Sequence, residues 1–194
     1  MPTTPSTTED PCSPSTPLLL QRAKAGDTTA FQALYECYAR ALFTFFLGYT
    51  ADEHLAEEMV NDTFLRVWQA LGRYREEGRF RGWLFRIARN IATDRHRRRQ
   101  RRPPEVLVDE DTIESLTHPT QLANELIARQ QALDDTYEAL QHLQPDYRTV
   151  LLLRFIEGLS VRETARAMER SEGAVRVLQF RALKALREHL KPDL

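Results

Sequence analysis

The stretch from residue 160 to residue 190 constrains the fold of this chain most, because it has the pattern of two helices joined by a tight turn. Ser160 and Glu163 have the spacing of a capping box, which predicts the start of a short helix. Residues 169 and 170 leave room for a turn, and Ser171 is a suitable N-cap for a second helix. We therefore predict a helix-turn-helix.

The second of these helices has two faces of different character. The face expected to pack on a core carries Val175, Leu178, Ala182, Leu186 and Leu190. The opposite face carries Arg176, Val177, Phe180, Arg181, Lys184 and Arg187. In a major groove, cations meet phosphates and guanines while apolar groups meet thymine methyls, which gives Val177 and Phe180 a role among the cations. We predict a DNA-recognition helix; the alternative is an ordinary amphipathic helical hairpin.

The net charge of the 194 residues is −1, but the charges are sorted by segment. Twelve arginines lie between Arg73 and Arg102, against only three acidic residues. From residue 103 to residue 125 there is no lysine or arginine at all. A strongly basic segment followed by an acidic one is compatible with a nucleic-acid-binding protein, whereas the net charge alone is not.

Other features limit the class of protein. Cys12 and Cys37 belong to no CxxC motif and have no histidine at ligand spacing, so we expect no disulfide framework, no zinc site and no cofactor. No apolar run is long enough for a membrane span. Residues 1–17 lack the features of a signal peptide and are expected to form a disordered tail. These observations predict a cytoplasmic protein.

Scarce glycine and apolar residues spaced by three and four predict an all-α chain. The expected architecture is two small helical domains, residues 18–102 and 124–194, joined by a flexible acidic linker, residues 103–123, that begins at Pro103-Pro104. Helices are predicted over Asp27–Leu47, Asp52–Leu71, Phe80–Arg99 and Asp146–Glu157, with a loop over Gly72–Arg79, a further helix through His142 and a stop at Gly158.

The outer face of the helix predicted over residues 52–71 combines carboxylates with large apolar side chains. It carries Glu58, Asn61, Asp62, Leu65 and Gln69, with Glu57 and Trp68 at its edge. Exposed Leu65 and Trp68 among acidic groups indicate a protein partner that is basic and partly apolar. The alternative is a solvated acidic face with a single exposed leucine.

The helix predicted over residues 80–99 has a polar stripe opposite its apolar face: Arg86, Arg89, Asn90, Thr93 and Arg97. Guanidinium groups offer a planar fork of donors suited to phosphates and bases. Upstream, Tyr74, Phe80 and Trp83 alternate with arginines, which is typical of a surface that stacks the bases of an unpaired strand. The alternative is that Phe80 and Trp83 belong to the core. We expect a core position less for Tyr74, which lies between arginines.

These segments include three motifs in a fixed order: residues 56–68, residues 80–90, and residues 157–160 with 171–176. Together they resemble the extracytoplasmic-function (ECF) group of bacterial RNA polymerase sigma factors. The resemblance covers nearly all of residues 18–191. It implies transcription initiation, with residues 18–102 as region 2 and residues 124–194 as region 4.

The resemblance also implies which residues bind each partner. Binding to the core polymerase, at the clamp helices of its largest subunit, would involve Glu58, Asn61, Asp62, Leu65, Trp68 and Gln69. Capture and melting of the −10 element would involve Arg73, Tyr74, Arg75, Arg79, Trp83, Arg86, Arg89, Asn90, Thr93 and Arg97. Recognition of the −35 element would involve Ser171, Arg176, Val177, Phe180, Arg181 and Lys184.

Further partners also follow from the resemblance. Region 4 would touch the flap of the second-largest subunit, and linker carboxylates such as Asp109, Glu110 and Asp111 would take the place of RNA phosphates in the polymerase. An anti-sigma factor would cover the same exposed faces. The chain departs from the family pattern at Asn61-Asp62, where Gln-Glu is usual, at Glu169, where the turn often has glycine, and at residues 177–179.

Three other functions are considered. A helix-turn-helix regulator that acts without polymerase would leave the outer face of the 52–71 helix unexplained. An enzyme acting on nucleic acid is not expected, because there is no carboxylate cluster with metal spacing, no glycine-rich phosphate loop and no nucleophile–base pair. A scaffold without a promoter role would not support transcription from a defined promoter.

Overall fold

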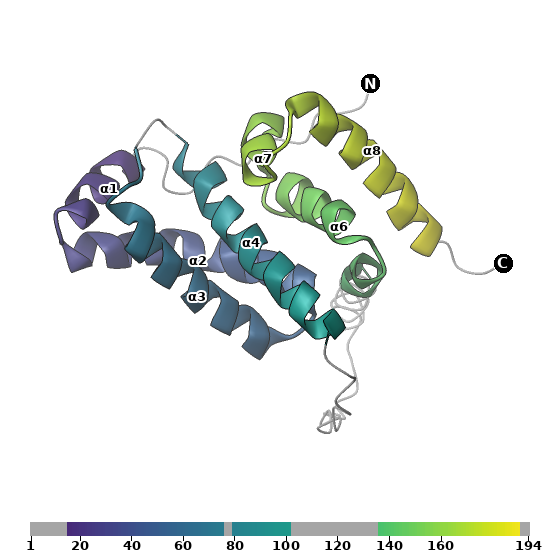
Figure 1. The fold of residues 1–194 in the computed structure, drawn as a ribbon, viewed down its shortest axis with the longest axis horizontal. Coiled ribbons are helices and arrows are strands. Elements are labelled where there is room, and N and C mark those ends of the chain that lie inside the picture. Colours follow the sequence, from purple (N-terminus) through teal and green to yellow (C-terminus); the bar gives the residue numbers. More distant parts are fainter. Residues whose placement is uncertain (1–14, 76–78, 102–135, 191–194) are drawn as a thin grey trace, which may run out of the picture.

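The computed structural model describes residues 15–75, 79–101 and 136–190, and these residues form helices and connecting turns, with no strand among them. Two groups of helices lie side by side, one from the first half of the chain and one from the second (Figure 1). The all-α architecture predicted from the sequence is confirmed. The expected tail up to residue 14, the tip of the 72–79 loop and the acidic linker lie outside the described residues.

The first group contains α1 (Thr16–Lys24), α2 (Thr28–Thr50), α3 (Glu53–Leu71) and α4 (Phe80–Arg101). The two middle helices begin where the sequence predicted, each with an aspartate as its N-cap. The Asp27 carboxylate accepts hydrogen bonds from the backbone N–H groups of Thr29 and Ala30, and Asp52 accepts one from Leu55. A hydrogen bond from the Thr29 hydroxyl to the ionised carboxylate, with those from the Ala30 N–H and Arg22, holds the pKa of Asp27 well below its usual range.

The core of this group is aromatic. Phe45 and Phe85 lie edge to face with ring centroids 5.7 Å apart, and both are fully buried. The buried Thr16 hydroxyl is 3.0 Å from the Tyr38 hydroxyl. Helix α1 therefore begins inside the segment predicted as a tail, because proline at residue 17 suits a first helical turn and Thr16 has a buried hydrogen-bonding partner.

The second group contains a short helical segment over residues 136–141, α6 (Pro145–Leu151), the π-helical turn η1 (Leu152–Ile156), α7 (Val161–Ala167) and α8 (Glu172–His189). The sequence predicted one regular helix over residues 146–157. The wider turn η1 instead closes through a 2.9 Å bond from the Glu157 N–H to the Leu152 carbonyl. Gly158 then ends the helix, as predicted, with a φ of +62°.

The helix-turn-helix forms by local hydrogen bonds. Both halves of the capping box between Ser160 and Glu163 are present, and the Ser171 hydroxyl accepts from the Ala174 N–H. Glu169 takes the left-handed conformation, with a φ of +54°, at the position where the family often has glycine. The turn thus keeps its backbone path with a non-glycine residue.

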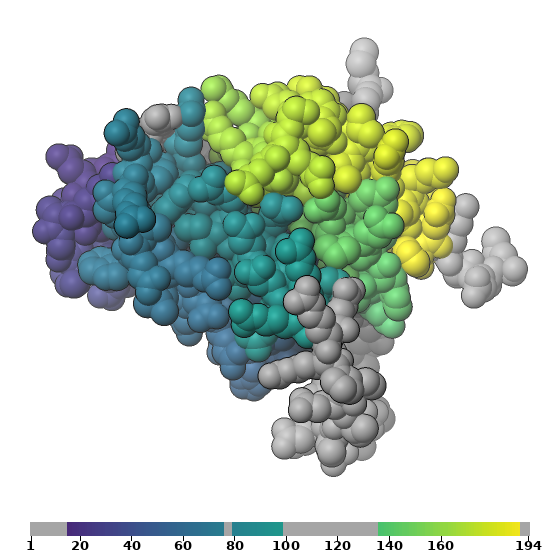
Figure 2. Space-filling view, viewed as in Figure 1, coloured from purple at the N-terminus to yellow at the C-terminus, as the bar shows by residue number. Residues whose placement is uncertain are grey.

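The two groups are joined by a closely packed interface (Figure 2). In this interface α7 lies against α4, and η1 lies against α2. Gly48 makes the second contact possible, since a Cβ atom there would lie 2.4 Å from Cδ2 of Leu152. At Gly82, between α4 and α7, a Cβ atom would lie 3.4 Å from the Glu163 carbonyl oxygen, which is an ordinary contact distance. Close approach of the two groups therefore requires glycine at residue 48 and not at residue 82.

Arg148 is the main polar link across this interface. Its side chain is buried, and its guanidinium donates to the carbonyl oxygens of Leu140 at 2.7 Å and Tyr49 at 2.9 Å, and also to the Gln141 side chain. A second buried arginine, Arg81, donates to the carbonyl of Glu157. Buried guanidinium groups with fixed carbonyl partners define one specific packing of the two groups.

Two expectations about chemistry and location are tested in part. Cys37 is disulfide-bonded, so the expectation of no disulfide is wrong for this residue. Within the described ranges, no helix combines the length and apolarity needed to cross a bilayer.

Candidate nucleic-acid and polymerase interfaces

The outer face of α8 carries exposed cations and apolar groups together. Phe180 is 73% exposed and Val177 is 52% exposed. Arg176, Arg181 and Lys184 are exposed beside them. We call these five residues the recognition face. A Phe ring exposed to this degree loses apolar burial unless a partner covers it, so the face has the character of a binding surface.

The inner face of α8 agrees with its predicted pattern except at the end. Val175 and Ala182 are fully buried, and Leu178 and Leu186 are half-buried. Leu190 is 45% exposed, because it is the C-cap residue and extends past the helices beneath it. The prediction that Leu190 is buried is therefore wrong.

The outer face of α3 presents two large apolar side chains. Leu65 is 57% exposed and Trp68 is 42% exposed, with the Trp68 ring edge on Phe31 at a centroid distance of 4.8 Å. Asn61, Asp62 and Gln69 are exposed around them. Glu58 is also exposed and pairs with Arg95 of α4 at 3.2 Å. The six residues predicted to bind polymerase thus lie on one surface, the α3 face.

The polar stripe of α4 is divided between solvent and the second helix group. Arg86 lies 3.5 Å from a Glu169 carboxylate oxygen, and Arg89 lies 3.7 Å from one of Asp146. The Arg89 side chain is only 17% exposed. Asn90 and Arg97 remain exposed, and Thr93 is half-buried. Two of the arginines predicted to contact DNA therefore contact region 4-like helices in this arrangement.

The aromatic residues near the 72–79 loop form a cluster. The rings of Tyr74 and Trp83 lie 4.5 Å apart, and Phe80 packs against both. Tyr74 is 8% exposed, whereas Trp83 is half-buried. We expected Trp83, more than Tyr74, to belong to the core. The exposed fractions show the reverse, because Tyr74 is the more buried of the two. Lys24 causes part of this burial, since it donates to the Tyr74 carbonyl and its ammonium lies 5.5 Å from the ring.

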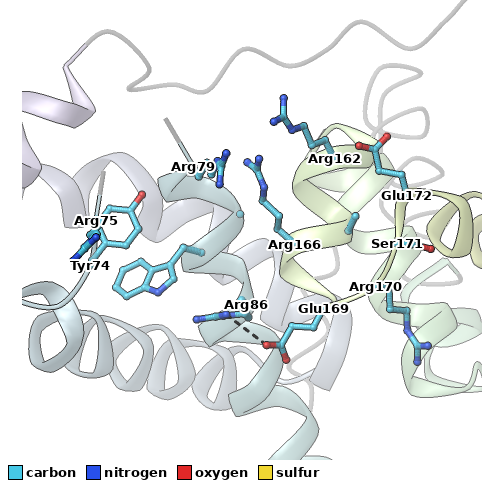
Figure 3. A pocket seen from close by; sticks show the side chains of 13 residues that line it. Tyr74, Arg75, Arg79, Arg86, Arg162, Arg166, Glu169, Arg170, Ser171 and Glu172 are labelled. Carbon is cyan, nitrogen blue, oxygen red and sulfur yellow. Dashed lines mark hydrogen bonds and ion pairs between the residues drawn. The ribbon is translucent and has the colours of Figure 1, made fainter. Parts of the chain in front are cut away.

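A basic cleft opens between α4 and the helix-turn-helix, with a volume of about 720 Å³. Its described wall holds the aromatics Tyr74 and Trp83 and six arginines: Arg75, Arg79, Arg86, Arg162, Arg166 and Arg170. Arg79, which immediately precedes α4, and Arg166 of α7 reach toward each other across it (Figure 3). Its only carboxylates among the described residues are Glu169 and Glu172.

Sequence reasoning did not find the polar groups at the interface. Glu157 is 6% exposed, and burial raises its pKa to about 8, although the charge of Arg81 acts against this rise. Burial also lowers the pKa of Arg148. An arginine or glutamate in an amphipathic helix ordinarily predicts an exposed position, so no signal in the sequence marked these residues as buried.

Known proteins match both helix groups. Residues 34–102 match the family model of sigma-70 region 2, and residues 133–186 match that of sigma-70 region 4. The ECF sigma factor SigX of Bacillus subtilis is 32% identical, over 83% of this chain and 84% of its own. The sigma-H factor of Pseudomonas aeruginosa is 33% identical, over 91% and 94%.

Two further relatives are consistent with these. The ECF sigma factor BldN of Streptomyces coelicolor is 35% identical over 90% of this chain, which spans 66% of that relative's length. Among solved structures, CnrH in complex with the cytosolic domain of CnrY superposes with a TM-score of 0.68 at 27% identity, covering 89% of this chain and 95% of that one.

Two helical domains with a helix-turn-helix in the second, matched by region 2 and region 4 models, define a sigma factor of RNA polymerase. Within that class, the chain belongs to the ECF sigma factors. It is therefore a DNA-binding transcription initiation factor that works with RNA polymerase, and a polymerase-independent regulator is not favoured.

Proposed function

We propose that this sigma factor reads the two promoter elements and binds the core polymerase with three separate surfaces. The proposed boundaries are region 2 at residues 18–102, a linker at 103–123 and region 4 at 124–194. The observation that carries the proposal is the recognition face, where Phe180 is 73% exposed among three cations on a capped helix-turn-helix. This face, together with Ser171, would read the −35 element through the major groove.

The α3 face would bind the clamp helices of the largest polymerase subunit. Leu65 and Trp68 supply an apolar centre, and carboxylates surround it, so the matching partner surface is basic with an apolar centre. The flap of the second-largest subunit would bind region 4. The acidic linker, including Asp109, Glu110 and Asp111, would pass through the polymerase; these residues lie outside the described ranges.

The −10 element would bind the α4 stripe and the arginines beside the aromatic cluster: Arg73, Arg75, Arg79, Arg86, Arg89, Asn90, Thr93 and Arg97. Tyr74 and Trp83 would provide stacking surfaces for unpaired bases. In the packed arrangement of the two domains, Arg86 forms an ion pair with Glu169, and Arg89 forms one with Asp146. The two domains must therefore move apart before the whole stripe reaches DNA.

A protein partner that covers the exposed faces would keep the sigma factor inactive, as an anti-sigma factor does. The similar solved structure is CnrH in complex with the cytosolic domain of CnrY, and this protein complex supports this part of the proposal. We place the protein in the cytoplasm, where promoter DNA and polymerase are found, and assign it no catalytic step and no cofactor.

Run-off transcription tests the proposal. Purified core polymerase and this chain would be incubated with a genomic fragment library, and the transcript starts would be mapped. We expect new starts downstream of two shared sequence elements, and we expect the variant Phe180→Asp to lose starts that depend on the upstream element. A start pattern identical to that of core polymerase alone would contradict the proposal.

A further inference from the structure

The basic cleft between α4 and the helix-turn-helix has positive charge on both walls. Arg75 and Arg79 come from the region 2 side, and Arg162 and Arg166 come from α7 on the region 4 side (Figure 3). The described lining has six arginines and two carboxylates, and such an excess of positive charge in a cleft raises the local concentration of anions.

The carboxylates in the cleft wall already form ion pairs with arginines. Glu169 lies 3.5 Å from Arg86 and 4.0 Å from Arg89, and Glu172 pairs with Arg176, which lies on the next turn of α8, at 3.4 Å. Within the described part of the chain, neither Arg75 nor Arg162 forms an ion pair or a hydrogen bond. The cleft therefore has guanidinium groups with donors available for an anion.

The positions of the two cleft walls are fixed by contacts between the domains that do not involve the charged groups of the cleft. Leu152 packs on Gly48, and the buried Arg148 binds carbonyl oxygens at the same interface. The two walls are therefore kept in place by packing elsewhere. A polyanion that binds arginines of both walls at once would stabilise the closed arrangement of the two domains.

The floor of the cleft adds an aromatic surface to the positive charge. The half-buried Trp83 ring and the ring of Tyr74 lie 4.5 Å apart there, and the volume of about 720 Å³ is in the usual range for small-molecule sites. Guanidinium forks suit phosphate oxygens, and a flat aromatic surface suits a nucleobase. An acidic peptide would use the arginines but would leave the rings without a stacking partner.

We propose that this cleft is a binding site for a nucleoside triphosphate, which bridges the two domains and holds them closed. Arg75 and Arg79 on one wall and Arg162 and Arg166 on the other would bind the phosphates, and Trp83 would stack on the base. The regulatory consequence rests on the proposed function, because the bound nucleotide would keep Arg86 and Arg89 away from promoter DNA.

Isothermal titration calorimetry of the full chain tests the site, with ATP, inorganic tripolyphosphate and adenosine as probes at constant ionic strength. We expect ATP to bind more tightly than tripolyphosphate, because the base adds stacking, and adenosine not to bind measurably. Arg162→Glu and, on the opposite wall, Arg75→Glu should each weaken ATP binding about tenfold or more. Both side chains are exposed, so both variants should fold.

The matched control is Arg66→Glu, an exposed arginine on α3 outside the cleft, which should bind ATP as the wild type does. Absence of ATP binding, or equal losses in all three variants, would overturn the site. Equal affinity for ATP and tripolyphosphate would overturn its assignment to a nucleotide. Absent ATP binding with intact run-off transcription would refute this inference alone. Because the inference expects ATP to reduce promoter binding, the proposed function is tested separately without nucleotides. Failure of the complex of this chain with core polymerase to bind promoter DNA under those conditions would refute the proposed function alone.

Discussion

Arg148 and Glu157 are the two residues at which burial most changes the ordinary behaviour of a side chain. Arg148 lies in the interface with no carboxylate bound to it in the described part of the chain. Its guanidinium donates hydrogen bonds to backbone carbonyl oxygens and to a side-chain amide oxygen instead. Such a group is costly to desolvate, but once its partners are in place they fix its geometry and that of its neighbours.

Glu157 makes the packing of the two domains sensitive to pH. Its pKa is about 8 in the structure and 4.5 when unperturbed, so its carboxyl is neutral in the packed state at pH 7 but ionised when exposed. The neutral Glu157 carboxyl therefore makes its full contribution to the free energy of unfolding below about pH 4.5, and this contribution is lost as the pH rises toward 8. We expect the free energy of unfolding from urea titrations to fall over this range.

The variant Glu157→Gln removes the titration and retains the shape of the side chain. Its free energy of unfolding should vary less with pH, and at pH 8 the ionisation cost that it avoids is on the order of 2–4 kcal/mol. Parallel pH profiles for wild type and variant between pH 5 and pH 8 would show that Glu157 is not the group responsible.

At the scale of single elements, α8 separates base recognition from phosphate binding. Arg181 and Lys184 are both exposed on the recognition face. Arg181→Ala should relax the preference at one base position and cost about 1–3 kcal/mol of binding, because a guanidinium fork pairs with one base edge. Lys184→Ala should weaken binding to all sequences equally and reduce its salt dependence. Fluorescence anisotropy on a panel of −35 duplexes at several salt concentrations measures both effects, and identical behaviour of the two variants would contradict these roles.

Helix α3 provides the test of polymerase binding. Asp62→Arg reverses a charge on the α3 face, and Leu65→Asp removes its apolar centre, while both positions are exposed. Each change should weaken binding to core polymerase by about 2 kcal/mol or more if these are hot-spot residues. Surface plasmon resonance with immobilised core measures the loss, and Glu53→Arg at the start of the same helix is the control. Undiminished affinity in both variants would remove this face from the proposed interface.

At the scale of the whole molecule, the closed packing depends on Gly48. Any side chain there meets Leu152, since the first added carbon already lies 2.4 Å from its Cδ2 atom. Gly48→Leu should therefore weaken the packing of the two domains by about 1–3 kcal/mol. Small-angle X-ray scattering should then show a larger radius of gyration than that of the wild type.

Gly72 supplies the matched control, because a Cβ atom there meets nothing within 4 Å. Gly72→Leu should leave the scattering profile unchanged. If Gly48→Leu also scatters as the wild type does, the closed arrangement does not depend on the contact with Leu152.

The local features of this fold could be predicted because their causes are local. Asp27, Asp52, Ser160 and Ser171 are N-caps in the structure, since a capping side chain needs only the backbone of the next few residues. The apolar spacing of α3 and α8 also predicted which faces are buried. The exceptions lie at ends and irregular turns, as with the start of α1 and the π-helical turn η1.

The sequence by itself determined the helices, their exposed faces and the family, because periodicity, capping and motif order are properties of short segments. Only the tertiary structure decided how the two domains meet, because that contact depends on distant residues such as Gly48 and Leu152. The same packing buries Arg148 and engages Arg86 with Glu169. The basic cleft depends on the same packing. Its two walls are about 80 residues apart in the chain, as Arg86 and Glu169 are, and only close packing of the domains brings these walls together.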